Sequence, residues 1–411
     1  MPVTYAPLWR MLNELQLTTI QLSASTGIAP NTITRLKHNK EVSLSVLERI
    51  CEFLKCDYCD VLSHIPEECS DHIAHIGTFT IKNRRYLGNK YKLLPFVSRV
   101  VEEHCQDVVS IADIFSGTGS VASAFHSRHI ITNDILYSNY ICNFAWFSSM
   151  SFDERKISEL IYYYNNMHSI VENYMTRNFA DTYFCRADCS KIGFIREDIE
   201  RQFKSGFLNE RERALLIMAL IYAMDRIANT CGHYDAYIKP AVFSRSLVLA
   251  FPQAPHDNSP ANACYNEDAN ILVRRISADL IYIDPPYNSR QYCDTYHLLE
   301  NIARWEQPEV FGVARKPNRN SQKSKYCSKK AVDAFADLIR HIKAKYILFS
   351  YNNMSNKGND RSNARIKDED IFTILAEFGR VRVFEENHKP FSAGKSNIKD
   401  NVERLFLCTR T

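Results

Sequence analysis

The chain has 411 residues, with 51 Lys and Arg against 47 Asp and Glu, which leaves a formal net charge of +4. Its 45% hydrophobic and 24% charged residues are typical of globular proteins and exclude wholesale disorder and fibrous repeats. At about 150 residues per domain, this length predicts two or three domains.

No segment of the sequence has the pattern of a membrane anchor. The longest uncharged apolar run, residues 214–224, is about half of the roughly 20 residues that a membrane-spanning helix needs. The N-terminal residues lack the charged and then apolar layout of a signal peptide. We therefore expect a cytoplasmic protein that does not contact a membrane.

Residues 1–63 have the spacing of apolar side chains that predicts a compact bundle of short helices. Thr18 or Thr19 can cap one helix that stops at Gly27, Pro30 suits the first turn of the next, and Ser43 can cap another. We expect a short turn over residues 57–62 to close this unit.

The run TIQLSASTGIAPNTITRLKHNK in this unit resembles the helix-turn-helix of the Cro and phage-repressor family. The resemblance implies that Asn31, Thr32, Thr34 and Arg35 face the major groove of DNA, with Arg35 or Lys37 contacting bases or phosphates. A small bundle used for dimerisation is the alternative. The segment holds six basic and six acidic residues, so its charge does not decide between the two.

Cysteines are numerous near the end of this unit. Cys56 and Cys59 have the spacing of a zinc knuckle, but no second pair follows at a usable distance. We therefore expect reduced, half-buried cysteines and no metal. Residues 64–81 then have the composition of a linker.

From about residue 108 the pattern changes to alternating strands and helices. Apolar runs predict strands over residues 108–115, 129–132, 279–283, 345–350, 381–386 and 402–408. Residues 140–265 are predicted to be mostly helical. This order predicts an α/β domain with a large helical insertion.

A glycine-rich turn follows the first of these strands. Gly117 and Gly119 allow a sharp bend and a close approach to a ligand, and Asp113 precedes them. Asp134 ends the next strand, where a carboxylate can accept hydrogen bonds from ribose hydroxyls. A tight turn without a ligand is the alternative for the glycines alone.

The sequence Asp284-Pro285-Pro286-Tyr287 follows the strand over residues 279–283 and is the most specific motif in the chain. Two prolines fix the backbone and keep their carbonyls free of competing N–H groups. The carboxylate of Asp284 and a proline carbonyl can each accept one hydrogen of a target amine, and Tyr287 offers a face for stacking a base. A purely structural turn is the alternative.

With these motifs, the sequence resembles the Dam-like DNA adenine-N6 methyltransferases over residues 82–150 and 265–411, most clearly in the phrase YIDPPYNSRQY. The resemblance implies a Rossmann-like sheet, S-adenosylmethionine as cofactor and duplex DNA as substrate. It implies Asp284, Pro285, Pro286 and Tyr287 as catalytic residues. It implies a larger set of cofactor-binding residues: Tyr86, Gly88, Lys90 (near the cofactor's carboxylate), Asp113, Phe115, Gly117, Gly119, Asp134 and Asp268.

This resemblance also sets the expected organisation of the chain. We expect a helix-turn-helix domain over 1–63, a linker over 64–81, a cofactor-binding half over 82–149, a helical target-recognition region over 150–264 and a catalytic half over 265–411. In catalysis of this kind, the target adenine must flip out of the duplex at a cost of a few kcal/mol.

A basic run follows the catalytic motif. Residues 310–332 contain no acid after Val310, and Arg315, Lys316, Lys323 and Lys325 are expected to form a mobile loop over DNA phosphates. A solvated charged face is the alternative. Phe391 is a candidate for contact with the flipped base, and a core phenylalanine is as consistent with the sequence.

The leading hypothesis is a DNA adenine-N6 methyltransferase of a restriction–modification system, whose helix-turn-helix represses its own promoter and can pair two chains into a homodimer. Two alternatives stay open: a transcriptional regulator with an inactive or cofactor-sensing methyltransferase domain, and an RNA adenine methyltransferase.

Overall fold

A computed structural model describes residues 3–15, 17–37, 40–64, 81, 84–167, 171–286, 289–319, 322–352, 366–387 and 402–410. The chain divides into two compact units, Met1–Thr78 and Phe79–Thr411. Within the described residues, no helix combines the length and the apolar character needed to cross a bilayer.

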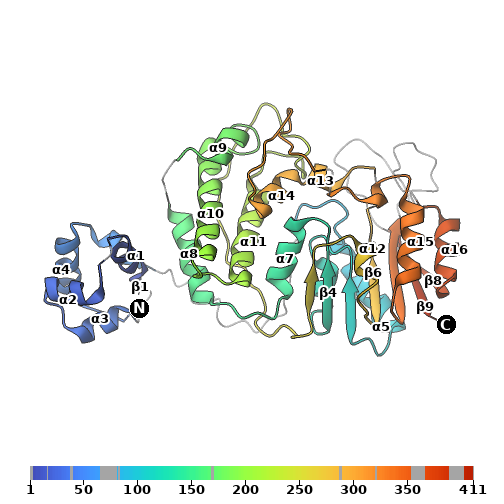
Figure 1. Ribbon diagram of the computed structural model, residues 1–411, viewed down its shortest axis with the longest axis horizontal. Helices are drawn as coiled ribbons and strands as arrows, with labels where there is room; N and C mark the ends of the chain where they lie inside the picture. Colours follow the sequence, from blue (N-terminus) through green and yellow to red (C-terminus); the bar gives the residue numbers. More distant parts are fainter. Residues whose placement is uncertain are drawn as a thin grey trace. The chain divides into compact units, whose positions relative to one another are not determined.

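The first unit is a bundle of short helices closed by a two-stranded sheet (Figure 1). Its elements are β1 Val3–Thr4, α1 Ala6–Glu14, α2 Thr19–Thr26, α3 Pro30–Lys37, α4 Leu44–Leu54, the 3-10 turn η1 Tyr58–Asp60 and β2 Ser63–His64. β1 pairs antiparallel with β2, so the two ends of the unit meet.

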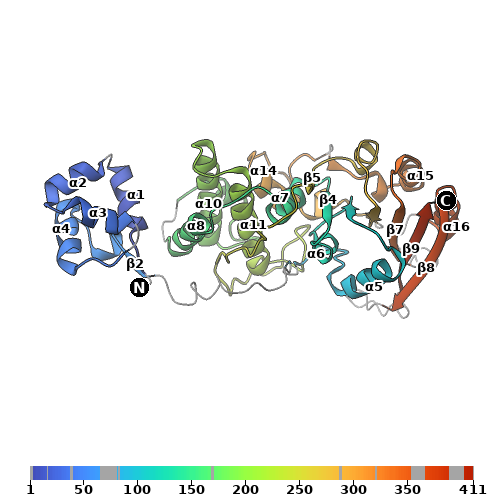
Figure 2. The ribbon, with the colours of Figure 1, turned by 90° about the horizontal axis from the view of Figure 1, so that it is seen from below.

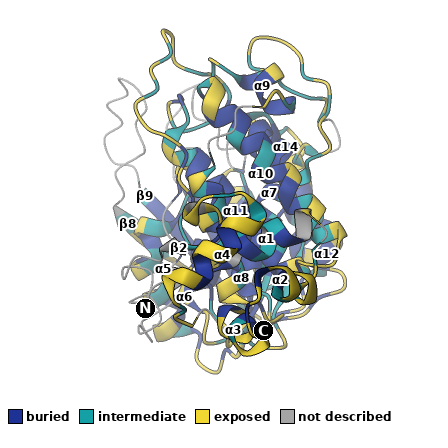
Figure 3. Ribbon diagram, turned by 90° about the vertical axis from the view of Figure 1, so that its left-hand side faces the viewer, coloured by how far each residue is buried: buried dark blue, intermediate teal, exposed yellow. Residues whose placement is uncertain are grey.

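The sequence shows why these helices start and stop where they do. Thr18 and Gln21 form a reciprocal capping box at the start of α2, and Gly27 ends it with a left-handed φ of 66°. The inner side chains form a core of their own, and the outer faces of α2, α3 and α4 are exposed (Figure 3). The predicted helices of this unit are confirmed.

The second unit is built on a seven-stranded sheet in the order β5-β4-β3-β6-β7-β9-β8. Its strands are β3 Ser110–Asp113, β4 His129–Asn133, β5 Ala263–Tyr265, β6 Leu280–Ile283, β7 Tyr346–Asn352, β8 Gly379–Asn387 and β9 Val402–Arg410. The five from β5 to β7 are parallel, and β9 joins antiparallel to both β7 and β8. The carboxyl ends of β3, β4 and β6 therefore lie side by side.

Helices cover both faces of this sheet, and α5 and α15 lie on opposite sides of it in Figure 2. One face carries α5 Leu94–His104, α6 Ser120–Ala124 and α7 Tyr137–Phe147, and α14 His297–Arg304 packs against α7. The other face carries α12 Ala269–Leu272, α15 Ala331–His341 and α16 Asp368–Ala376. The remaining short elements are η4 Tyr91–Leu93, α13 Tyr292–Thr295 and η6 Lys325–Cys327.

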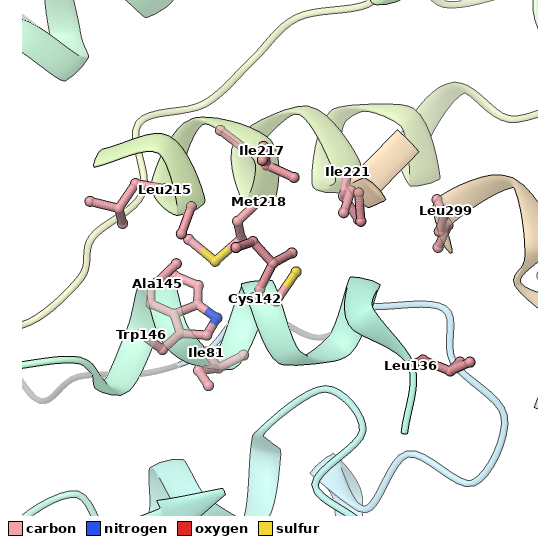
Figure 4. Packing of buried hydrophobic residues seen from close by; sticks show 14 of the residues in the cluster. Ile81, Leu136, Cys142, Ala145, Trp146, Leu215, Ile217, Met218, Ile221 and Leu299 are labelled. Carbon is pink, nitrogen blue, oxygen red and sulfur yellow. The ribbon is translucent and has the colours of Figure 1, made fainter. Parts of the chain in front are cut away.

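The helical insertion shares its core with the sheet domain. Its helices are α8 Glu154–Asn166, α9 Tyr174–Phe179, α10 Arg186–Lys204 and α11 Glu210–Ile227. α11 is apolar on nearly every side, as expected for a helix that is surrounded by others. Met218 and Ile221 of α11 face Cys142 of α7 across this core (Figure 4). The α/β domain with a helical insertion, beside a separate helical unit, is confirmed.

The end of the insertion differs from the prediction. Residues 140–265 were expected to be mostly helical, but residues 228–262 form turns and irregular chain before the short strand β5. Four prolines in this stretch remove backbone donors, and side chains of the helices bind its backbone instead. Asn165 of α8, for example, both donates to Leu249 O at 2.9 Å and accepts from Leu249 N–H at 2.8 Å.

Arg211 of α11 is fully buried and holds several of these segments together. Its guanidinium donates to the carbonyls of Ala145, Met150 and Pro255 at 3.2, 2.7 and 2.7 Å. These acceptors include the C-terminal end of α7, where helix carbonyls lack partners within the helix. Burial lowers the pKa of Arg211 to about 10, and the group still stays charged at neutral pH.

Candidate active site

The glycine-rich turn after β3 has the backbone conformation that its glycines allow. Gly117 and Gly119 have φ of +51° and +80°, values that side chains other than glycine rarely adopt. A Cβ at Gly119 would lie 2.3 Å from Oδ1 of Asn143 in α7, and one at Gly117 would lie 3.3 Å from the ring of Tyr86. Gly119 therefore lets α7 pack close, and Gly117 faces the Tyr86 segment.

Asp134, at the end of β4, fixes this turn. Its Oδ2 accepts the Gly117 N–H at 2.9 Å, and its Oδ1 accepts the Leu136 N–H at 2.8 Å. Burial raises the pKa of Asp134 to about 6, although these backbone hydrogen bonds oppose the shift. A side-chain hydrogen bond from Asn139 also opposes the shift.

Asp113, at the end of β3, is buried beside the same turn. Its Oδ1 has no hydrogen-bond partner among the described residues. Burial, and then the neighbouring Asp284 and Asp134, raise the pKa of Asp113 well above its usual value. A cationic or N–H donor in the adjoining space would satisfy this oxygen.

Asp284 follows β6 and lies in a cluster of charged groups. The ammonium of Lys90 lies 3.2 Å from Asp284 Oδ1 and 2.5 Å from Oε1 of Glu403 in β9. Burial raises the pKa of Asp284 to about 6, Lys90 opposes the shift and Glu403 adds to it. The sequence placed Lys90 near a cofactor carboxylate, but its ammonium lies between two carboxylates of the protein.

These segments line one pocket that opens to solvent, and the empty space between them, with the solvent at the mouth included, is about 1000 Å³. Its lining includes most of the residues that the sequence singled out: Tyr86, Gly88, Lys90, Asp113, Phe115, Gly117, Asp134, Asp268, Asp284, Pro285, Pro286 and Lys325. Gly119 stands behind the turn against α7. Tyr287 and Phe391 lie outside the described residues.

Sequence analysis missed an aromatic cluster that shapes this pocket. Tyr296 stacks on Tyr86 with ring centroids 4.5 Å apart, and Tyr292 lies at 5.5 Å. Tyr296 also accepts the Leu87 N–H through its hydroxyl at 2.7 Å. Both tyrosines follow the Asp284 motif closely. The frequency of tyrosine in that stretch is the sequence feature that could have indicated this cluster.

The far end of the basic run also reaches the pocket. Tyr326 packs edge-on against Phe115 with ring centroids 5.1 Å apart. The ammonium of Lys325 lies 3.8 Å from Oδ2 of Asp268, which caps α12. Gln322, Ser324, Lys325 and Tyr326 therefore form part of the pocket wall, a position that nothing in the local sequence indicates.

The other basic residues of that run have different surroundings. Arg315 and Lys323 are exposed, whereas Lys316 pairs with Asp235 and Arg319 pairs with Asp294. The positive charge available to a partner is therefore smaller than the sequence suggests. It is concentrated on the exposed residues.

The helix-turn-helix candidates all lie on α3 of the first unit. Asn31, Thr34 and Lys37 are exposed and Thr32 is half-buried, while Ile33 and Leu36 face the core. Arg35 is exposed, but its guanidinium donates twice to Glu41 O, at 2.8 and 3.2 Å. These hydrogen bonds use two of the five N–H donors of the guanidinium group.

Comparison with known proteins gives two family matches. Residues 86–358 match the D12 class N6 adenine-specific DNA methyltransferases, and residues 7–67 match the Cro/C1-type HTH DNA-binding domains. The first match covers most of the second unit, including the pocket.

Individual relatives agree with the family match. The chain is 34% identical to Type II methyltransferase M.FokI of Planomicrobium okeanokoites, over 78% of this chain and 51% of that protein. It is 35% identical to Modification methylase StsI of Streptococcus sanguinis, over 79% and 52%. It is 30% identical to Type II methyltransferase M.NlaIII of Neisseria lactamica, over 77% and 95%. The chain thus spans about half the length of the first two relatives.

Proposed function

Because this chain belongs to the D12 class of N6 adenine-specific DNA methyltransferases, we propose that it methylates adenine N6 at specific sites in duplex DNA. The cofactor of this proposal is S-adenosylmethionine, which supplies a sulfonium methyl group when bound. The observation that carries the proposal is the single pocket that joins the Gly117 turn to Asp284, Pro285 and Pro286.

The charges of the pocket fit this cofactor. Four carboxylates line it (Asp134, Glu267, Asp268 and Asp284), with Asp113, whose raised pKa opposes its ionisation, against the two ammonium groups of Lys90 and Lys325. This excess of negative charge favours a ligand with a sulfonium and an ammonium group. The unpartnered Oδ1 of Asp113 suits the ammonium group, and Asp134 suits the ribose hydroxyls.

Asp284 and Pro285 have the chemistry that the reaction needs. The lone pair of the adenine amine is delocalised into the ring, so its nitrogen is a weak nucleophile. Carboxylate and carbonyl acceptors at Asp284 and Pro285 would bind the two amine hydrogens and favour a tetrahedral nitrogen whose lone pair points at the methyl group. Preorganised acceptors and proximity then lower the barrier, with the base flipped into the site.

Transfer of labelled methyl groups to duplex DNA tests this function directly. We expect incorporation into a duplex that contains the target site and none into single-stranded RNA of the same sequence. An enzyme that labels only the RNA, or neither substrate although it binds the cofactor, would contradict the proposal. Mapping methylated adenines in DNA from cells that express the protein would identify the recognition sequence and test its role in a restriction–modification system.

Replacing Asp134 by Asn is expected to weaken cofactor binding about tenfold at neutral pH, because a charged acceptor for the ribose is lost. The raised pKa of Asp134, about 6, also gives a sign for the pH dependence. Wild-type affinity should fall as pH drops through 6, because protonation removes the acceptor. Calorimetric titration at pH 5.5 and 7.5 should show a smaller pH effect in the variant, and an unchanged dissociation constant would reject the role.

We propose that the first unit binds the protein's own promoter and pairs two chains into a homodimer. Support comes from the family match and from the exposed face of α3. The unit has its own hydrophobic core, separate from the two cores of the second unit. We also propose that residues 150–264 recognise the target sequence. The proposed domain boundaries lie after residues 63, 81, 149 and 264.

Removal of residues 1–63 is expected to abolish specific promoter binding and to leave methylation of a cognate duplex within about twofold. Separate cores allow the second unit to keep its fold. Gel retardation of the promoter fragment and a methylation assay on the same preparation measure both effects. Full-length protein with Asn31→Ala and Lys37→Ala is the matched control and should lose only promoter binding. A folded truncated protein that cannot methylate would show that the unit assists catalysis.

A further inference from the structure

The charged side chains of Lys90, Asp284 and Glu403 lie close together, although the three residues are far apart in the sequence. Lys90 precedes η4, Glu403 lies in β9, and their side chains are only 5% exposed, while that of Asp284 is 14% exposed. The Lys90 ammonium is closer to Glu403, at 2.5 Å, than to Asp284, at 3.2 Å.

We propose that Glu403 is a positioning residue, which holds the Lys90 ammonium away from Asp284 so that the Asp284 carboxylate stays available to the target amine. The inference rests on the methyltransferase function proposed above. It assigns a role to a residue outside every motif that the sequence displays.

Glu403 provides the Lys90 ammonium with a second carboxylate acceptor beside Asp284. An ammonium has three donors, and a buried one that faces a single carboxylate would contact it directly, at about 2.7–2.9 Å. A target amine would then have to displace a charged donor from Asp284. With Glu403 present, the closer contact of the ammonium is to Glu403, and the charge of Lys90 still favours the ionised form of Asp284.

The two neighbours act on Asp284 in opposite directions. Lys90 lowers the pKa of Asp284 and Glu403 raises it, while burial is the larger influence. Within the part of the chain that the structure describes, Asp113 and the Tyr282 hydroxyl are further titratable groups beside Asp284. Removal of Glu403 should therefore shift the titration of Asp284 to lower pH, and removal of Lys90 should shift it to higher pH.

The experiment measures kcat against pH for the full-length protein and its Glu403→Gln variant, with duplex DNA at saturation. We expect kcat to fall about tenfold at neutral pH, KM for the cofactor to change less than twofold, and the acid limb to move down by about one pH unit. Lys90→Gln should move the same limb upward. Glu403→Asp, which keeps the charge, should restore the limb toward its wild-type position.

Asp368→Asn is the matched control, because Asp368 pairs with Arg404, the neighbour of Glu403 in β9. The Asp368→Asn variant loses a partly buried ion pair, and we expect the acid limb of its kcat–pH profile to stay at the wild-type position. Cofactor binding by each variant establishes that the pocket is folded. An unchanged kcat and acid limb in Glu403→Gln, or shifts of equal sign in the Glu403 and Lys90 variants, would overturn the inference. A wild-type protein without methylation would instead overturn the proposed function.

Discussion

Replacing Asp284 by Ala is expected to reduce methylation by roughly a thousandfold, a loss typical of removing a preorganised acceptor from a reacting centre. The carboxylate lies at the carboxyl end of β6 inside the pocket and is held next to Lys90. Without it, the amine keeps only the Pro285 carbonyl as an acceptor. Single-turnover methylation of a cognate duplex measures the change.

Cofactor binding should survive this substitution within a few fold, because the Gly117 turn and Asp134 are held by contacts that do not involve Asp284. Asp284→Asn is the matched control: it keeps one acceptor oxygen and should lose less activity than Asp284→Ala. Comparable turnover in Asp284→Ala and wild type would remove Asp284 from the mechanism. Loss of cofactor binding would show instead that Asp284 maintains the cofactor-binding pocket.

Replacing Arg211 by Ala is expected to destabilise the second unit by about 3–5 kcal/mol. The substitution removes the donors to the carbonyls of Ala145, Met150 and Pro255. A buried carbonyl without a partner costs about 1–3 kcal/mol. The shorter alanine side chain also leaves a cavity between α7, α11 and the irregular chain of residues 228–262.

Chemical denaturation of the second unit measures this loss. Arg226→Ala is the matched control, because Arg226 lies on the same helix with an exposed side chain, and it should change stability by less than about 0.5 kcal/mol. Equal midpoints for the two variants would show that water replaces the Arg211 hydrogen bonds at no cost.

The insertion is tied to the pocket through α7. Asn139 of this helix donates to the Tyr86 hydroxyl at 2.9 Å, and Asn143 donates to Ser116 Oγ at 2.8 Å. On its other side, α7 packs against α11 of the insertion. α7 therefore contacts both the insertion and the glycine-rich turn.

Local sequence determined the first unit almost completely. The Thr18 and Gln21 side chains cap α2, Gly27 ends it, and Pro30 starts α3. These signals act within a few residues of each other, so they can be read without knowledge of the fold. Ile33 and Leu36, which are three residues apart, form the buried face of α3.

Sequence also placed the strand-end residues around one pocket. Asp113 lies at the carboxyl end of an apolar strand, Asp134 and Asp284 follow two others, and parallel strands bring their carboxyl ends to one edge of a sheet. The alternation of strands and helices was enough to predict this edge. It was not enough to predict β5, whose three residues are too few to show an alternating pattern, or the irregular chain before it.

Only the tertiary structure decided which distant side chains complete the site. Glu403 reaches Lys90 because β9 lies next to β7 in the sheet, and Tyr326 reaches Phe115 because the basic run turns back to the pocket. Arg211 likewise finds its carbonyl partners on three separate segments. Such contacts depend on strand order and on the path of loops, which the packing of the whole domain sets. Periodicity and capping, by contrast, are properties of a few neighbouring residues.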